Sequence, residues 1–177
     1  MHGSRRLALA FIAPHLRAGQ RVLDICCGSA WLMEHVHAAG GTYFGIDWKA
    51  TTNAATMKHD LTRTPWPCGQ FDLAVTVYGT QHLLGDEAVA WREARNHAAR
   101  FIVVGRYFSE APAREMNRED PLTGYNHSGI DALALSTGWR KPRDFSIFCY
   151  HNETYQTRED GEAADGNAFA ALMEPAE

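Results

Sequence analysis

Short apolar runs alternate along this chain with segments whose apolar residues recur at helical spacing. The runs have the length and boundaries of buried strands, and we predict strands at 21–26, 42–47, 56–61, 71–79 and 100–108. Helical spacing, with capping and glycine stop signals, predicts helices at 1–19, 29–39, 86–98 and 129–139. Strands that alternate with helices predict an α/β fold, with a mainly parallel sheet and helices on both faces. Residues 144–157 can add one or two closing strands, which makes about seven.

The length of the chain fits one domain. With 177 residues, 45% of them hydrophobic, it can bury one sizeable core but hardly two. We expect a single domain over 1–157, with an N-terminal helix in 1–19 and a polar, exposed insertion loop at 107–128. The remainder, 158–177, is acidic and rich in alanine and glycine, and we expect a flexible tail there.

The charge balance gives no signal for a polyanionic partner. The net charge is −4 and the sequence pI is near 6.1, which does not favour nucleic acid or an anionic membrane. No stretch approaches the ~20 consecutive apolar residues that cross a bilayer. Two arginines precede an apolar run near the N-terminus, as in a secretion signal, but Pro14 and His15 interrupt that run. We therefore expect an amphipathic opening helix and a cytoplasmic protein.

Four cysteines, at positions 26, 27, 68 and 149, do not have the pattern of a disulfide framework in a chain of this length. They also lack the paired short spacing of a zinc site, and we expect no metal. Cys26 and Cys27 are interpreted as small, half-buried apolar residues at a strand end.

Candidate ligand-binding residues follow the first three predicted strands, at the edge where parallel sheets bind ligands. Gly28 allows a tight turn after the first strand, although the G-x-G-x-x-G spacing of a pyrophosphate loop is absent. Asp47 follows Asp24 at close to the ~20 residues expected for a ribose-binding acid, and Trp48 can cover an adenine face. Asp60 is placed to accept a hydrogen bond from the exocyclic amine of a base.

In order and spacing, these elements resemble the class I S-adenosylmethionine-dependent methyltransferases. The segments that carry the resemblance are "RVLDICCGSAWL", "YFGIDW" and "MKHDLTRTPWPCGQFDLAVTVYGTQHL". In that family the first loop reads roughly V-L-D-x-G-C-G-x-G, a ribose-binding acid ends the second strand, and a third acid precedes an L-P-F-P-like turn and F-D-x-V. The likeness covers about residues 20–108, and more loosely extends to 157. It implies a three-layer Rossmann-like sandwich with S-adenosylmethionine as cofactor.

The resemblance also implies roles for individual residues. Asp24 would orient the first loop and the methionine amino group, Asp47 would hold the ribose, and Trp48 would lie against adenine. Asp60 and Leu61 would contact the base. The full set implied for the cofactor is Asp24, Cys26, Gly28, Ala30, Asp47, Trp48, Asp60, Leu61 and Tyr78.

Two positions depart from the family pattern. Cys26 stands where the first loop glycine is expected, and Ala30 stands where the last one is expected. Cysteine and alanine are small replacements for glycine, so the loop can still close. Either side chain could also narrow the space beside the methionine end of the cofactor.

Candidate catalytic residues follow the fourth strand. A sulfonium methyl donor needs mainly in-line positioning, and a general base only where the acceptor must lose a proton. His82 is the first choice for a base or an acceptor-positioning group, and Tyr78 the second, although His82 could instead cap the next helix. Tyr107, Tyr125 and His127 flank the insertion loop, on the side where substrate is expected, and are the candidates for substrate binding.

Several signatures of macromolecular substrates are missing. No [DN]-P-P-[FYW] motif follows the fourth strand, and Pro67-Cys68 precedes that strand rather than following it as in cytosine C5 methylation. A small-molecule acceptor is therefore favoured. A non-catalytic protein of the same fold, acting as a binding partner or regulatory subunit, is the alternative. A nicotinamide-dependent oxidoreductase is disfavoured by the missing glycine spacing.

Overall fold

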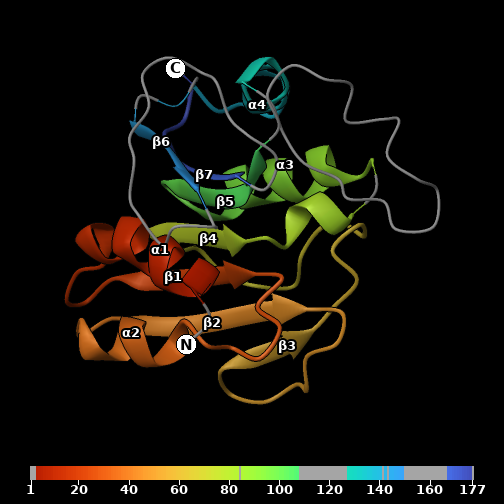
Figure 1. The fold of residues 1–177 in the computed structure, drawn as a ribbon. Coiled ribbons are helices and arrows are strands. Elements are labelled where there is room, and N and C mark those ends of the chain that lie inside the picture. Colours follow the sequence, from red (N-terminus) through yellow and green to blue (C-terminus); the bar gives the residue numbers. More distant parts are fainter. Residues whose placement is uncertain are drawn as a thin grey trace.

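The computed structural model describes residues 3–83, 85–107, 127–140, 142, 144–149 and 167–176. Seven strands form one sheet in the order β3-β2-β1-β4-β5-β7-β6 (Figure 1). Strands β1 to β5 pair in parallel, whereas β7 is antiparallel to both β5 and β6. The strands are β1 (Arg21–Ile25), β2 (Thr42–Asp47), β3 (Thr56–Lys58), β4 (Leu73–Val77), β5 (Phe101–Tyr107), β6 (Asp144–Cys149) and β7 (Asn167–Met173). The mainly parallel sheet of about seven strands is confirmed.

Helices cover both faces of this sheet, as the alternating pattern predicts. Helices α1 and α2 share one apolar cluster with the sheet, and α3 and α4 share another on the opposite face (Figure 1). No helix in the described part of the chain is long and apolar enough to cross a membrane. The helices are α1 (Gly3–Ile12), α2 (Met33–Ala38), α3 (Glu87–His97) and α4 (His127–Ser136), with 3-10 turns η1 (Ala13–His15) and η2 (Thr80–His82).

The central strands are apolar on both sides because both sides are covered. In β5, Phe101 and Val103 enter the cluster of α3 and α4, whereas Ile102 and Val104 enter the cluster of α1 and α2. Successive side chains of a strand point to opposite faces, so an uninterrupted apolar run supplies two cores at once. This arrangement leaves the edge formed by the carboxyl ends of β1 to β4 for polar residues.

The prediction of a flexible tail over 158–177 is wrong for its last part. Residues 167–173 form β7, which lies between β5 and β6 and hydrogen-bonds to both. Ala168, Ala170 and Ala171 are fully buried there. Alanine is a weak strand former, and its place in this strand depends on the two flanking partners and on burial rather than on local preference. The domain therefore extends beyond residue 157 and includes β7.

Candidate cofactor site

A cleft of about 1310 Å³ opens at the carboxyl edge of the sheet. Its walls come from the ends of β1, β2, β3 and β4, the edge at which parallel sheets bind ligands. It brings together eight of the residues singled out from the sequence: Cys26, Gly28, Asp47, Trp48, Asp60, Leu61, Tyr78 and His82. Asp24 and Ala30 do not line it.

The loop after β1 turns through three left-handed residues. Cys26, Gly28 and Ala30 have φ angles of 59°, 52° and 54°. In this region a side chain costs roughly 1–2 kcal/mol, so glycine is the residue that fits best. Cys26 and Ala30 thus occupy the two positions at which the sequence pattern expects glycine, and both adopt the backbone conformation that glycine favours.

The side chain of Cys26 has room only because residue 79 is a glycine. A methyl group on Gly79 would overlap the Cβ of Cys26 and would lie 2.9 Å from its Sγ. The same methyl group would be 3.0 Å from the hydroxyl oxygen of Thr76. Gly79 follows β4, so the loop after β1 and the turn after β4 are in direct contact across the cleft floor.

Asp47 joins the ends of β1 and β2. Its Oδ2 accepts a hydrogen bond from the backbone N–H of Gly28 at 3.0 Å, and its Oδ1 accepts one from the N–H of Lys49 at 2.7 Å. The residue is only 7% exposed. Each carboxylate oxygen has a second lone pair, so Asp47 can still accept hydrogen bonds from a diol in the cleft.

The segment after β3 forms one wall of the cleft, and its polar groups are largely engaged with one another. Asp60 accepts hydrogen bonds from the backbone N–H and hydroxyl of Thr62, at 3.1 and 2.7 Å, and lies 3.3 Å from Nε of Arg63. The two hydrogen bonds from Thr62 lower the pKa of Asp60. Trp48 also lines the cleft and is 61% exposed, with the Lys49 ammonium 4.6 Å from the centre of its ring.

The turn after β4 supplies the last wall. Tyr78 has a left-handed φ of 56°, and its backbone N–H donates to the carbonyl of Val104 at 2.7 Å. His82 ends the 3-10 turn η2 and lines the cleft with an exposed side chain. Among the described residues, no group of histidine, cysteine, aspartate and glutamate could hold a metal ion.

Several solved structures share this architecture over nearly the whole chain. One is 1,6-didemethyltoxoflavin-N1-methyltransferase of Burkholderia thailandensis with bound 1,6-didemethyltoxoflavin and S-adenosylhomocysteine, with a TM-score of 0.70, 12% identity, and coverage of 98% of this chain and 79% of that one. S-adenosylmethionine-dependent methyltransferases of Mesorhizobium loti and Clostridium acetobutylicum give TM-scores of 0.68 and 0.66 at 16% and 12% identity. They cover 97% and 98% of this chain, and 97% and 91% of their own.

The chain has the class I methyltransferase fold. No family model matches its sequence, and no curated protein matches it either. The predicted resemblance is thus confirmed at the level of the fold. It is carried by tertiary structure together with a few residues at the strand ends.

In this methyltransferase-fold chain, Asp24 lies beneath the loop rather than in the cleft. It is 3% exposed and accepts a hydrogen bond of 2.9 Å from the Tyr43 hydroxyl. Burial raises the pKa of Asp24 to about 7, and the nearby Asp47 carboxylate adds to the effect. The hydroxyl of Tyr43 is also hydrogen-bonded with the Cys27 thiol. Gly45 leaves room for this group, because a methyl group there would lie 2.6 Å from the Tyr43 hydroxyl oxygen.

Cys27 is buried, whereas Cys26 is half-buried and lines the cleft. Burial raises the pKa of Cys26 well above its ordinary value and that of Cys27 to about 12. Both are free of disulfide bonds, and their raised pKa values disfavour the thiolate that nucleophilic chemistry requires. Their part in the site is therefore one of size and packing.

The three substrate-binding candidates are not brought to the cleft in the described part of the chain. Tyr107 is 3% exposed and packs in the core against Phe145, with ring centres 6.1 Å apart. It points to the same face of β5 as Phe101 and Val103, which explains its burial. Tyr125 and the side chain of His127 lie outside the described residues.

The cleft also contains residues that the sequence did not single out. They are Lys49, Lys58, His59, Arg63, Val77 and Leu83. Most of them lie within a few positions of a predicted strand end. That proximity is the feature of the sequence from which they could have been predicted to line the cleft. Gly79 also lines the cleft, within the segment from Tyr78 to His82 that was expected at the junction of methyl donor and substrate. The local sequence does not show why this residue is a glycine, because the reason is its contact with Cys26.

Proposed function

We propose that this protein is a methyltransferase that transfers the methyl group of S-adenosylmethionine to a small-molecule acceptor. The observation that carries the proposal is the position of Asp47. Its buried carboxylate joins the loop after β1 to the end of β2, inside a cleft at the ligand-binding edge of a class I methyltransferase fold.

The residues present fit the cofactor. The methionine part would lie along residues 26–30, where the backbone keeps the left-handed turns of a glycine-rich loop. Asp47 would accept hydrogen bonds from the ribose hydroxyls, and the exposed ring of Trp48 would cover the adenine. Asp60 and Leu61 would meet the edge of the base. Of the two departures from glycine, Cys26 is accommodated, since Gly79 leaves the space that its side chain needs.

In the proposed reaction the main task of the protein is to position the methyl donor and the acceptor. S-adenosylmethionine, when bound, supplies a methyl group on a sulfonium that a nucleophile can attack in line. His82 and Tyr78, at the end of β4, would orient the acceptor, and His82 would take its proton where one must leave. The walls after β1 and β4 would keep water from the reacting atoms.

A small-molecule acceptor is supported because the sequence lacks features that would bind a nucleic acid. The net charge of −4 gives no basis for binding a nucleic acid, and no nucleic-acid methylation motif follows β4. The Burkholderia thailandensis enzyme of the same fold contains a bound small heteroaromatic molecule, 1,6-didemethyltoxoflavin. We infer an acceptor of comparable size here.

Calorimetric titration tests this proposal. Wild-type protein should bind S-adenosylhomocysteine, and Asp47→Ala should weaken that binding by roughly 10- to 100-fold, which corresponds to a hydrogen-bonding group worth ~1–3 kcal/mol. Asp72→Ala is the matched control, because the Asp72 carboxylate also accepts a backbone N–H, from Arg21 at 2.7 Å, but outside the cleft. No heat of binding at millimolar ligand, or equal losses in both variants, would contradict the proposal.

A non-catalytic binding protein is the second candidate. Cys26 and Ala30 favour it, because both have side chains at left-handed positions where the family resemblance leads us to expect glycine. Such a protein would bind S-adenosylhomocysteine without transferring a methyl group to any acceptor. Turnover of radiolabelled S-adenosylmethionine on one defined small molecule would rule this candidate out.

A further inference from the structure

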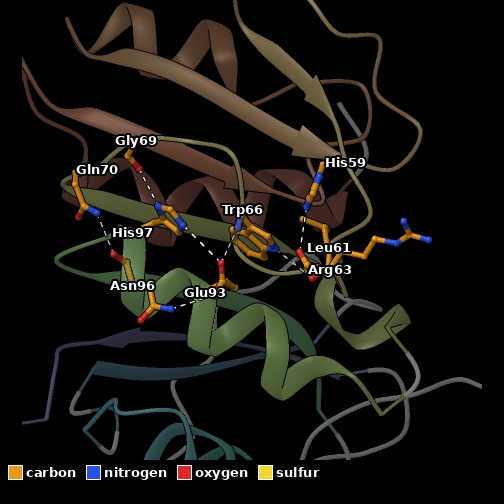
Figure 2. Close-up of polar contacts among 9 residues, drawn as sticks. All are labelled: His59, Leu61, Arg63, Trp66, Gly69, Gln70, Glu93, Asn96 and His97. Carbon is orange, nitrogen blue, oxygen red and sulfur yellow. Dashed lines mark hydrogen bonds and ion pairs between the residues drawn. The ribbon is translucent and has the colours of Figure 1, made fainter.

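Hydrogen bonds connect helix α3 to the cleft wall at residues 59–63 (Figure 2). The indole Nε1–H of Trp66 donates to the carbonyl oxygen of Leu61 at 3.2 Å. The backbone N–H of Trp66 donates to Oε2 of Glu93 at 2.8 Å. Trp66 is 2% exposed and Glu93 is 5% exposed, so both bonds are shielded from water. The connection runs from the helix, through Trp66, to the backbone of the wall.

Neighbouring side chains fix Glu93 and Trp66 in turn. Asn96 donates its Nδ2–H to Oε1 of Glu93 at 3.0 Å, and Nε2 of His97 lies 3.6 Å from Oε2. The His97 ring stacks on the Trp66 indole with 6.2 Å between centres and 10° between planes. Its Nδ1 lies 3.1 Å from the carbonyl oxygen of Gly69. A buried carboxylate requires such partners, and here they hold it where it meets Trp66.

The cleft wall has no regular structure of its own to keep its shape. The chain leaves the sheet after Lys58, earlier than the pattern predicts, and no helix or strand is formed between there and β4. The side-chain hydrogen bonds within the wall are exposed, those from Thr62 to Asp60 as well as the contact of His59 Nε2 with the carbonyl oxygen of Arg63 at 3.0 Å. Leu61 is 2% exposed and packs in the same core cluster as Trp66. The hydrogen bond from the Trp66 indole adds a buried restraint on the backbone of the wall at this residue.

We propose that Trp66 and Glu93 are positioning residues for the candidate cofactor cleft. Neither lines the cleft. They act through the backbone of Leu61, and they hold in place the wall that carries Asp60. The identity of the ligand rests on the proposed function, whereas the hydrogen bonds that hold the wall do not.

Trp66→Phe tests the proposal, because it keeps an aromatic ring and the backbone N–H but removes the indole donor. Gln70→Ala is the matched control. Gln70 Nε2 donates to the carbonyl oxygen of Asn96 at 3.0 Å, so it joins the same segment to the same helix. Figure 2 places that contact at the end of the network opposite His59, Leu61 and Arg63. Glu93→Gln is a second variant that weakens the same connection while keeping the side-chain shape.

The first measurement is amide hydrogen exchange of residues 59–63 without ligand. Trp66→Phe should speed exchange there by about five-fold, as expected for one lost hydrogen bond, and Gln70→Ala should not. Glu93→Gln should have a smaller effect in the same direction. Unchanged exchange at 59–63 in Trp66→Phe would overturn the proposal.

The second measurement compares S-adenosylhomocysteine with S-inosylhomocysteine, which lacks the exocyclic amine of the base. Trp66→Phe should raise the Kd for S-adenosylhomocysteine by roughly three- to ten-fold and reduce the preference over the inosine analogue. A general loss of stability would weaken both ligands alike, and that result would also overturn the proposal. If the wild type binds neither ligand, the proposed function fails, and the exchange experiment still decides whether Trp66 holds the wall.

Discussion

The Cβ of Cys26 occupies the space that any side chain on Gly79 would need. The two residues belong to different strand ends, β1 and β4, and they meet at the floor of the cleft. In a glycine-rich loop the small residue is in the loop itself. Here the small residue stands on the opposite side of the contact, which lets the loop carry a cysteine without opening.

Gly79→Ala should destabilise the protein by about 1–3 kcal/mol, because the new methyl group meets Cys26 and the Thr76 hydroxyl rather than open space. Cys26→Gly in the same chain should restore most of that loss, and a double-mutant cycle from urea unfolding measures the coupling. Gly69→Ala is the control, since the nearest atom to its new methyl group is the flexible Arg21 Nη2 at 3.3 Å. Additive effects of the Cys26 and Gly79 substitutions would contradict the contact.

Ala30→Gly should stabilise the protein by about 0.5–1 kcal/mol. Ala30 has a φ of 54°, and glycine adopts that conformation without the steric cost that alanine bears. Ala38→Gly provides the contrast, because Ala38 is an exposed residue of helix α2 and should lose about 0.5–1 kcal/mol on the same change. Thermal unfolding of the two variants should therefore move in opposite directions. A destabilised Ala30→Gly would show that the methyl group contributes more through packing than it costs in strain.

Stability should fall as pH rises through the range in which Asp24 ionises. Burial raises the pKa of Asp24 in the folded protein from 3.8 to about 7. Between these values the folded state binds more protons than the unfolded state, so the free energy of unfolding decreases with pH from about 4 to about 7 and loses this dependence above that range. Asp24→Asn stays neutral and can still accept the Tyr43 hydroxyl hydrogen bond.

The measurement is the difference in unfolding free energy between wild type and Asp24→Asn at pH 5 and pH 8. The variant should gain stability relative to the wild type as the pH rises, since ionisation of Asp24 beside Asp47 no longer occurs. Taking the difference removes the contribution of the other titrating groups. A difference that stays constant across the range would mean that Asp24 is already ionised at pH 5.

Local patterns were sufficient for much of the fold. Uninterrupted apolar runs such as 101–104 predicted strands buried on both faces, and the alternation with helical spacing predicted the layers. The order of small motifs placed Asp47, Gly28 and Asp60 at the ligand-binding edge, where the structure has them. These inferences succeed because each depends on a window of a few residues and on the rule that parallel strands end at one edge.

Contacts between distant segments required the tertiary structure. The strand at 167–173 forms because β5 and β6 complete its backbone hydrogen bonds. The local sequence does not predict this pairing, because the segment is rich in alanine, which is a weak strand former. The side chain of Tyr107 points into the core, because side chains alternate between the two faces of β5. Its position at the end of that strand had led us to predict a role in substrate binding. The role of Gly79 is evident only from its contact with Cys26, and the role of Glu93 only from its hydrogen bond with Trp66. The sequence determines all these contacts, but only through the order of the strands in the sheet. That order cannot be derived from a short segment of the sequence, because it brings together residues that are far apart along the chain.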